Sequence, residues 1–439
     1  MIRFRSVTSP AAAALLLIHV PASGEVQMSP LTTFAGDGWL APLEVSWLSD
    51  TGATERSIAY SASNDTLYVA SRNGGPHIRM LDGTAGTELN AASEGVAMTG
   101  VSGGTFPINC VAATPDGVLY ASNLVSPVTA ASGFKIYRWD DVGSGPVTVF
   151  NSNTITAGRM GDTLDAFGSG ASTLLVAGES NSTGTGARNG YAIFAPPAAG
   201  TDFTGTLVTF SGANPAAGDF RTGITFLDAD SVIGSQGGGG FKFTSFAGST
   251  GTFDQAKLLT NTSERPMDYI VLGGIPLLAT LECNGNTTAP PTTYSTVRIY
   301  DLTVFNTPVL VASGRIATSY NTQGTSGPGT GSVQWGKVTG NSATLYALST
   351  NNGIQAFTVT AAPPEPALEF KTLQFNGSQL TATWASAAGR TYRFEASKDL
   401  SVWTPVATAL PAGAGGTTTY VWNIPAGFSD RAQVRVVRE

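Results

Sequence analysis

Short apolar runs alternate along the chain with clusters of glycine, asparagine, aspartate, proline and serine, which predicts β-strands joined by turns. The clearest unit is Asp65 to Asp82, where residues 67–71 and 78–81 are apolar, β-favouring runs on either side of a turn cluster. The same pattern returns five more times, at intervals of about 45 to 65 residues. We therefore expect six similar β-modules.

Each module has the pattern of three or four strands. The expected second strands are residues 67–71, 119–123, 174–178, 232–235, 277–281 and 345–349. A shorter apolar run precedes each of them and is separated from it by a tight turn. A third run, which often carries an aromatic residue, follows. Radially repeated modules form β-propellers, because neighbouring modules bury faces that none could bury alone. The predicted fold class is all-β, with a six-bladed β-propeller; seven blades are the alternative if residues 31–48 form more than one strand.

The last module runs into a proline-rich stretch directly after its third strand, so one outer strand is missing. Leu43, Val45 and Trp47 alternate with Glu44 and Ser46 shortly before the first module. We expect a strand near residues 43–48 to complete the last blade and to close a propeller of residues 25–360, which would remove an exposed sheet edge.

A second domain is expected after the propeller. Residues 361–366, with the sequence AAPPEP, are typical of a stiff linker, since clustered prolines favour extended geometry. Residues 367–439 contain about six short apolar runs. Their size and spacing predict a small β-sandwich of the immunoglobulin or fibronectin type.

The first 24 residues have the pattern of a secretory signal peptide. Arg3 and Arg5 precede an apolar run, and Ala22-Ser23-Gly24 is a small-residue cleavage site. The apolar run is about half the length that a membrane-spanning helix needs, and no later segment is long enough. We expect an exported protein, either extracellular, on the cell surface or periplasmic, with no transmembrane segment in the mature chain.

Charge and rare residues narrow the chemistry. A net charge of −7 with no basic stripe argues against nucleic-acid binding. The repeat pattern places Cys110 and Cys283 roughly across the ring, so two buried free thiols are expected rather than a disulfide. Beyond the signal peptide His77 is the one histidine, which cannot supply a multi-histidine metal site. No cofactor fingerprint, metal cluster or catalytic set is apparent.

Three segments carry a family resemblance: Arg56 to Gly75, Thr99 to Leu124 and Phe134 to Asp141. The repeats resemble WD40-like and YVTN-like propellers, although the Trp-Asp dipeptide is absent from the ends of most third strands and occurs at residues 139–140. More narrowly, they are similar to an exported bacterial family, domain-of-unknown-function family 4623. The resemblance implies a propeller over about residues 31–360 and brings no catalytic residues. The C-terminal segment Tyr392 to Val406 is similar to small accessory β-domains of exported bacterial proteins.

Arginines recur just before the expected first strands. Those positions and the neighbouring loops give the candidate ligand-binding residues Arg56, Arg159, Asp162, Arg221, Arg265, Asp268 and Tyr294. Loops entering first strands and loops joining second to third strands share one propeller face, and they are the long ones in this chain. Guanidinium groups there could bind an acidic ligand. The alternative is that these arginines pair with Asp162, Asp268 and loop carbonyls and hold neighbouring blades together.

Three functions follow from these patterns. The first is a non-catalytic exported protein that binds a protein or carbohydrate partner through its long-loop face. The second is a hydrolase or lyase acting on acidic polysaccharide at the channel mouth. Its carboxylates would have to come from a set of six: Asp162, Asp165, Glu179, Asp219, Asp268 and Glu282. The third is a purely structural envelope or extracellular scaffold.

Overall fold

The structure is a computed structural model of the chain. It describes residues 2–5, 26–126, 132–155, 158–180, 189–211, 215–236, 240–254, 264–283, 294–303, 307–317, 330–362, 368–387, 389–428 and 431–439. The chain divides into two compact units, one of residues 25–361 and one that joins residues 1–24 to residues 362–439. The regular elements of the described residues are strands and 3₁₀ turns of three residues, which confirms the all-β prediction.

The larger unit contains six antiparallel meanders that follow one another along the chain. The first three are β4 (Ser57–Ser61), β5 (Thr66–Ser71), β6 (His77–Asp82) and β7 (Glu88–Leu89); β8 (Phe106–Ala113), β9 (Leu119–Leu124), β10 (Phe134–Trp139) and β11 (Val147–Ser152); and β13 (Asp165–Phe167), β14 (Leu174–Ser180), β15 (Gly190–Ala195) and β16 (Thr204–Thr209), with β12 (Arg159–Met160) also pairing with β14. The 3₁₀ turns η1 (Ala91–Ser93) and η2 (Gly170–Ser172) lie in the connections.

The other three meanders have the same order. They are β17 (Gly223–Asp228), β18 (Ser231–Ser235), β19 (Lys242–Ala247) and β20 (Thr250–Phe253); β21 (Glu264–Leu272), β22 (Ile275–Glu282), β23 (Val297–Asp301) and β24 (Val309–Gly314); and β25 (Gly331–Thr339), β26 (Ser342–Ser349) and β27 (Ile354–Ala361). A single parallel pair, Thr209 with Thr250, joins the third meander to the fourth.

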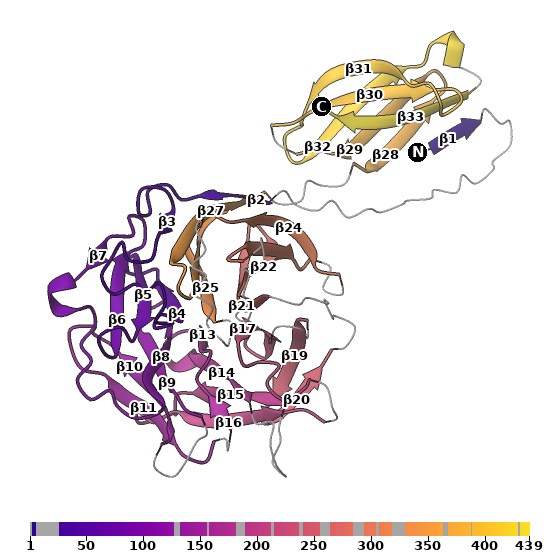
Figure 1. The fold of residues 1–439 in the computed structure, drawn as a ribbon. Helices are drawn as coiled ribbons and strands as arrows, with labels where there is room; N and C mark the ends of the chain where they lie inside the picture. Colours follow the sequence, from indigo (N-terminus) through magenta and orange to yellow (C-terminus); the bar gives the residue numbers. More distant parts are fainter. Residues whose placement is uncertain are drawn as a thin grey trace. The chain divides into compact units, whose positions relative to one another are not determined.

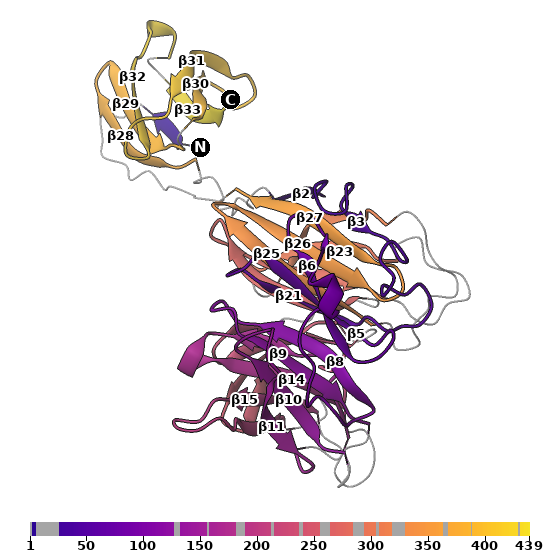
Figure 2. The ribbon, with the colours of Figure 1, turned by 90° about the vertical axis from the view of Figure 1, so that its left-hand side faces the viewer.

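The sixth meander is completed by a strand from the start of the unit. Val26–Pro30 forms β2 and pairs antiparallel with β27, from Val26 opposite Ala361 to Pro30 opposite Phe357 (Figure 2). The short strand β3 (Trp39–Leu40) also pairs with β27. The predicted closing strand near residues 43–48 was wrong, because these residues form turns in which Leu43 has a positive φ of 70°. Trp47 and Leu48 are buried there by packing rather than by strand pairing.

The first strands of the meanders contact one another in a closed series around a common centre (Figure 1). β4 contacts β8, β8 contacts β13, and the series continues through β17, β21 and β25 back to β4. Six hydrophobic clusters lie between successive meanders, including one that packs Tyr346 of the sixth against Tyr60 of the first. Second strands that lie between two clusters are buried on both faces, so that β5 and β9 are buried at all six positions.

The smaller unit has two antiparallel sheets around one core. One sheet contains β28 (Phe370–Asn376), β29 (Gln379–Ala385) and β32 (Thr417–Asn423); the other contains β30 (Thr391–Ser397), β31 (Thr404–Pro411), β33 (Arg431–Arg438) and β1 (Ile2–Arg5). The turn η4 (Ala426–Phe428) precedes β33. Trp384 and Trp422 of the first sheet pack against Phe394 of the second. Most of the predicted linker lies outside the described residues, which stop at Ala362 and resume at Leu368.

Two further sequence predictions can be compared with the structure. Cys110 and Cys283 are free and buried, as predicted. A faint strand pattern in the sequence predicts the fourth strand of the fourth meander at residues 257–260, which lie outside the described residues; the strand that pairs with β19 is β20. The earlier position follows from a tight turn after Ala247, where Gly248 has a positive φ of 58°.

Candidate functional site

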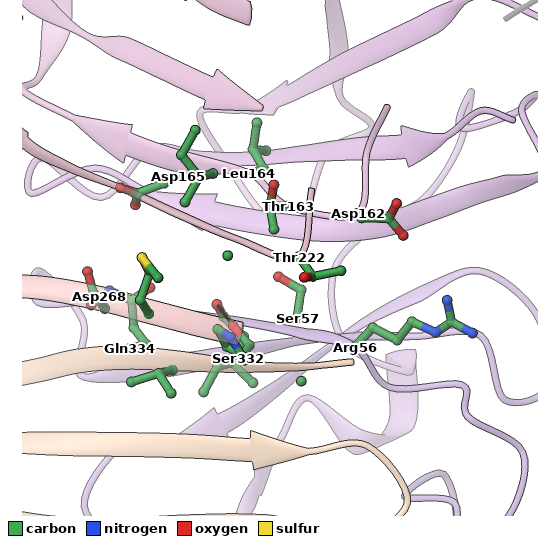
Figure 3. Close-up of a pocket in the computed structure, with 17 residues that line it drawn as sticks. Arg56, Ser57, Asp162, Thr163, Leu164, Asp165, Thr222, Asp268, Ser332 and Gln334 are labelled. Carbon is green, nitrogen blue, oxygen red and sulfur yellow. Dashed lines mark hydrogen bonds between the residues drawn. The ribbon is translucent and has the colours of Figure 1, made fainter. Parts of the chain in front are cut away.

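A narrow cavity of about 40 Å³ lies at the centre of the ring. Residues on or next to the first strands line it. Arg56 and Asp162 lie at one end, and Asp165, Asp268 and Gln334 lie at the other (Figure 3). Such a volume has room for one or two water molecules, so the ring centre is a narrow waist between two mouths. The end that holds Arg56 is reached from the long connections, and the other end faces the tight turns between first and second strands.

Asp162 is the fixed anionic group of the long-loop end. Its side chain is 1% exposed, and Arg159 donates to both of its oxygens, from Nε at 2.5 Å and from Nη2 at 2.7 Å. The turn between the two residues depends on Gly161, which has a φ of 98° and passes so close to Asn123 that a Cβ would lie 2.0 Å from its carbonyl oxygen. This turn folds Asp162 back onto Arg159, and the pairing raises the pKa of Arg159.

Three further arginines surround this pair. Nε of Arg221 lies 3.9 Å from Oδ2 of Asp162, a contact too long for a hydrogen bond. Arg56 donates to the carbonyl of Ala53. Arg265, which directly precedes Pro266 at the cavity, is close enough to Arg221 for their charges to interact. Asp162 thus lies near the guanidinium groups of Arg159, Arg221 and Arg56, and Arg265 joins them through Arg221.

A fifth arginine, Arg72, was not singled out in the sequence because it follows a second strand rather than preceding a first one. Its guanidinium group stacks on Phe106, 4.0 Å from the ring centroid, and donates to Asn109 and to the carbonyl of Ala53. Arg56 lies 5.5 Å from the same ring. We call Arg56, Arg72, Arg159, Arg221 and Arg265 the arginine cluster.

Repulsion within the arginine cluster shows in its pKa values. Burial lowers the pKa of Arg72 to about 10, and the nearby charge of Arg56 contributes. Burial also lowers the pKa of Arg56 and Arg265, and each is lowered further by a neighbouring arginine, Arg159 and Arg221 respectively. Like charges are therefore held close together at the mouth of the channel.

Asp165 and Asp268 meet at the other end of the waist. The Thr225 hydroxyl lies 3.0 Å from Asp165 Oδ2 and 3.4 Å from Asp268 Oδ1, and the Phe226 N–H donates to Asp165. Asp268 also accepts the N–H groups of Tyr269 and Trp335 and the Gln334 amide. Burial raises the pKa of both carboxyls, and the charge of Asp165 raises that of Asp268 further.

The structure separates the predicted site residues into two groups. It brings Arg56, Arg159, Asp162, Arg221 and Arg265 together at the long-loop mouth, and it places Asp268 beyond the waist. Tyr294, also predicted as a ligand-binding residue, does not present an exposed ring. Tyr294 is 2% exposed, and its carbonyl accepts a hydrogen bond from Arg315. Parts of the long loops, including residues 181–188, 284–293 and 318–329, lie outside the described residues.

Comparisons with known proteins concern the fold. The structure is similar to that of a DUF4623 family protein from Bacteroides eggerthii, with a TM-score of 0.52 and 14% identity, over 83% of this chain and 88% of that one. A weaker likeness is to a gluconolactonase from Xanthomonas campestris, with a TM-score of 0.41 and 12% identity, over 81% of this chain and 99% of that one. Another is to a protein of unknown function from Dyadobacter fermentans, with a TM-score of 0.42 and 10% identity, over 70% of this chain and 95% of that one. Neither a protein-family model nor a curated protein matches the chain.

The first likeness is consistent with the family resemblance of the sequence, whereas the likeness to WD40-like repeats stays a prediction. Within the described parts of the chain, no three histidine, cysteine, aspartate or glutamate residues gather as a metal site would require. Those parts also contain no helix with the length and apolar character of a membrane span.

Proposed function

We propose that the larger unit is a six-bladed β-propeller and that the smaller unit is an immunoglobulin-like β-sandwich. Six consecutive meanders, a closed series of first strands and a hydrophobic cluster between each neighbouring pair support the propeller. Two sheets packed around one core support the sandwich. The N-terminal sequence supports an exported protein of the extracellular space, cell surface or periplasm.

The proposed function is non-catalytic binding of an acidic ligand at the long-loop mouth. The observation that carries it is the arginine cluster. Asp162 accepts two hydrogen bonds from Arg159, whereas Nε of Arg221 lies 3.9 Å from Oδ2 of Asp162. If Arg221 only joined blades, its guanidinium group would be expected to lie within hydrogen-bond distance of that carboxylate. A ligand that brings carboxylate or sulfate groups would relieve the repulsion between neighbouring arginines and accept paired N–H donors.

A ligand with repeated acidic groups suits this geometry best. The guanidinium groups come from the first, third, fourth and fifth meanders and from the turn after β5, so they surround the channel mouth rather than form one pocket. An acidic polysaccharide presents carboxylates at regular intervals and can contact several such groups at once. We expect the affinity to fall steeply with salt, because these charges are partly exposed.

Hydrolysis or lysis of the same ligand is the second candidate. The Asp165–Asp268 pair favours it, since a carboxyl with a raised pKa can serve as a general acid. The geometry argues for binding instead, because a waist of about 40 Å³ separates this pair from the arginine cluster and is too narrow for a sugar ring. A purely structural scaffold is the third candidate and predicts no ligand.

Isothermal titration calorimetry with an oligogalacturonate tests the proposal, with a maltooligosaccharide of equal length as the neutral control. We expect saturable binding of the acidic oligomer only, and a loss of about tenfold in affinity for Arg221→Gln. Arg138→Gln is the matched control, because Arg138 pairs with the exposed Asp140 away from the channel. Unchanged affinity in Arg221→Gln would contradict the proposal, and new reducing ends or unsaturated products would support the enzyme.

A further inference from the structure

The mouth on the tight-turn side opens into a larger cavity of about 440 Å³. All six first strands, or the residues directly after them, contribute to its lining, so it lies on the axis of the ring. Cavities that hold small molecules usually have volumes of several hundred Å³. The sequence pattern does not point to this cavity, because the turns on this side are short and most of the lining residues belong to strands.

Aromatic residues form part of the lining of this cavity. They come from five of the six strands: Tyr60, Phe167, Phe226, Tyr269 and Trp335. Phe167 and Phe226 lie with their ring centroids 5.7 Å apart. The aliphatic residues Leu227, Ile270 and Val271 extend the wall towards solvent, and Val271 is 58% exposed. We call this lining, together with its acidic floor, the aromatic bowl.

The floor of the aromatic bowl is acidic. Asp165 and Asp268 are its two charged residues, and neither lysine, arginine nor histidine is found among the described residues that line it. Asp165 is partly exposed, whereas Asp268 is 8% exposed. Arg56 of the arginine cluster lies at the far end of the narrow waist, beside Asp162 (Figure 3).

The hydrogen-bonding groups of the lining are unevenly distributed. The donors of four residues are already engaged within the protein: Tyr60 with Asp65, Thr114 with Asp116, Gln334 with Asp268, and Trp335 Nε1 with the Asp268 carbonyl. The carboxylate oxygens on the floor are acceptors. A neutral sugar would need several donors from the wall, but a ligand that brings its own positive charge needs only acceptors and ring faces.

We propose that the aromatic bowl binds a small organic ammonium ion. Aromatic faces attract such cations through their quadrupoles, and a carboxylate at the end of the cavity supplies the opposite charge. The aliphatic rim contacts the apolar part of the ligand. This site is separate from the arginine cluster, so the channel accepts ligands of opposite charge at its two mouths.

Proton release provides a signature of this binding. Asp165, Asp268, Tyr60 and Tyr269 are the titratable groups that face the cavity from β13, β21 and β4. Burial raises the pKa of all four, and an incoming cation would lower the pKa of the two carboxyls. We therefore expect binding to release protons and affinity to increase as the pH rises through the titration of the pair.

The test is calorimetric titration of the full chain with choline chloride, in two buffers that differ in ionisation enthalpy. We expect a millimolar or tighter dissociation constant and a buffer-dependent heat that reports the proton released. The neutral isostere 3,3-dimethyl-1-butanol separates charge from shape, and we expect no binding of it. Glucose serves as the neutral polyhydroxylated probe.

Two sets of variants locate the site. Asp165→Asn removes the charge while its amide oxygen can still accept the Phe226 N–H, and we expect at least about a tenfold loss of choline affinity. Asp230→Asn removes an exposed charge from the same face and serves as the matched control. Tyr269→Phe should keep the affinity, and Tyr269→Leu should lower it about threefold.

Absence of choline binding at millimolar concentrations would overturn the proposal. Equal binding of the isostere would contradict a charged ligand, and binding of glucose in place of choline would assign the cavity to a neutral polyol. If Asp165→Asn does not fold, the Tyr269 variants and the isostere still decide between these results. The oligogalacturonate titration concerns the other mouth, so either proposal can fail without the other.

Discussion

Asp162→Asn separates the structural and the ligand-binding roles of the arginine cluster. The substitution keeps the shape of the side chain and removes the charge that Arg159 contacts at 2.5 and 2.7 Å. Breaking a fully buried ion pair costs about 3–5 kcal/mol, because it leaves one charge without a partner. Asp162 is 1% exposed but Arg159 is 26% exposed and can be rehydrated, so we expect a loss of about 2 kcal/mol. In a unit of this size that corresponds to a fall in Tm of about 3–5 °C.

Ligand affinity should change in the opposite direction. Once Asp162 is neutral, Arg159 and Arg221 become available to an incoming carboxylate, and we expect oligogalacturonate to bind at least about threefold more tightly. Differential scanning fluorimetry and calorimetry on the same preparations measure both effects, with Asp140→Asn as the exposed control. A Tm within about 1 °C of the wild type would refute the stability argument. A loss of affinity would show that Asp162 itself helps to bind the ligand.

Three other outcomes can be checked on the purified protein. Folding raises the pKa of Asp165 and Asp268. Their contribution to stability is therefore fully present below the unfolded pKa of about 3.9 and is lost as the pH rises through the folded pKa. Asp165→Asn should for this reason raise Tm more at about pH 8 than at about pH 4. Deleting residues 25–30 removes the partner of β27 and should lower Tm and promote aggregation through the open edge, measured by light scattering. Cys110 and Cys283 are buried with a pKa raised by burial to about 12, so they should react with a thiol reagent only after unfolding, and fast reaction of the native protein would argue against their placement.

Strand positions could be predicted from the sequence because local patterning determines them. The second strands are continuous apolar runs between turn residues, and β5 and β9 begin within one residue of the expected position. The closing strand could not be found in the same way. Alternation at Leu43, Val45 and Trp47 is typical of a strand, but β2 is stabilised by its pairing with β27, more than 300 residues later in the chain.

The candidate site was predictable in part for a related reason. Arg159 and Asp162 are neighbours in sequence and sit at a repeated position, so their meeting could be anticipated. The partnership of Asp165 with Asp268 joins residues about 100 positions apart, through the Thr225 hydroxyl. Trp335 lies on a first strand and is 6% exposed, as a core residue would be; only the closure of the ring shows that it also lines a cavity.

A paired titration tests most directly whether the channel has two mouths of opposite chemistry. Wild type, Arg221→Gln and Asp165→Asn would each be titrated with oligogalacturonate and with choline at one salt concentration. The account predicts that Arg221→Gln loses affinity for oligogalacturonate alone and that Asp165→Asn loses affinity for choline alone. If either variant lost both ligands, or if neither variant lost any, the two sites described here would be contradicted.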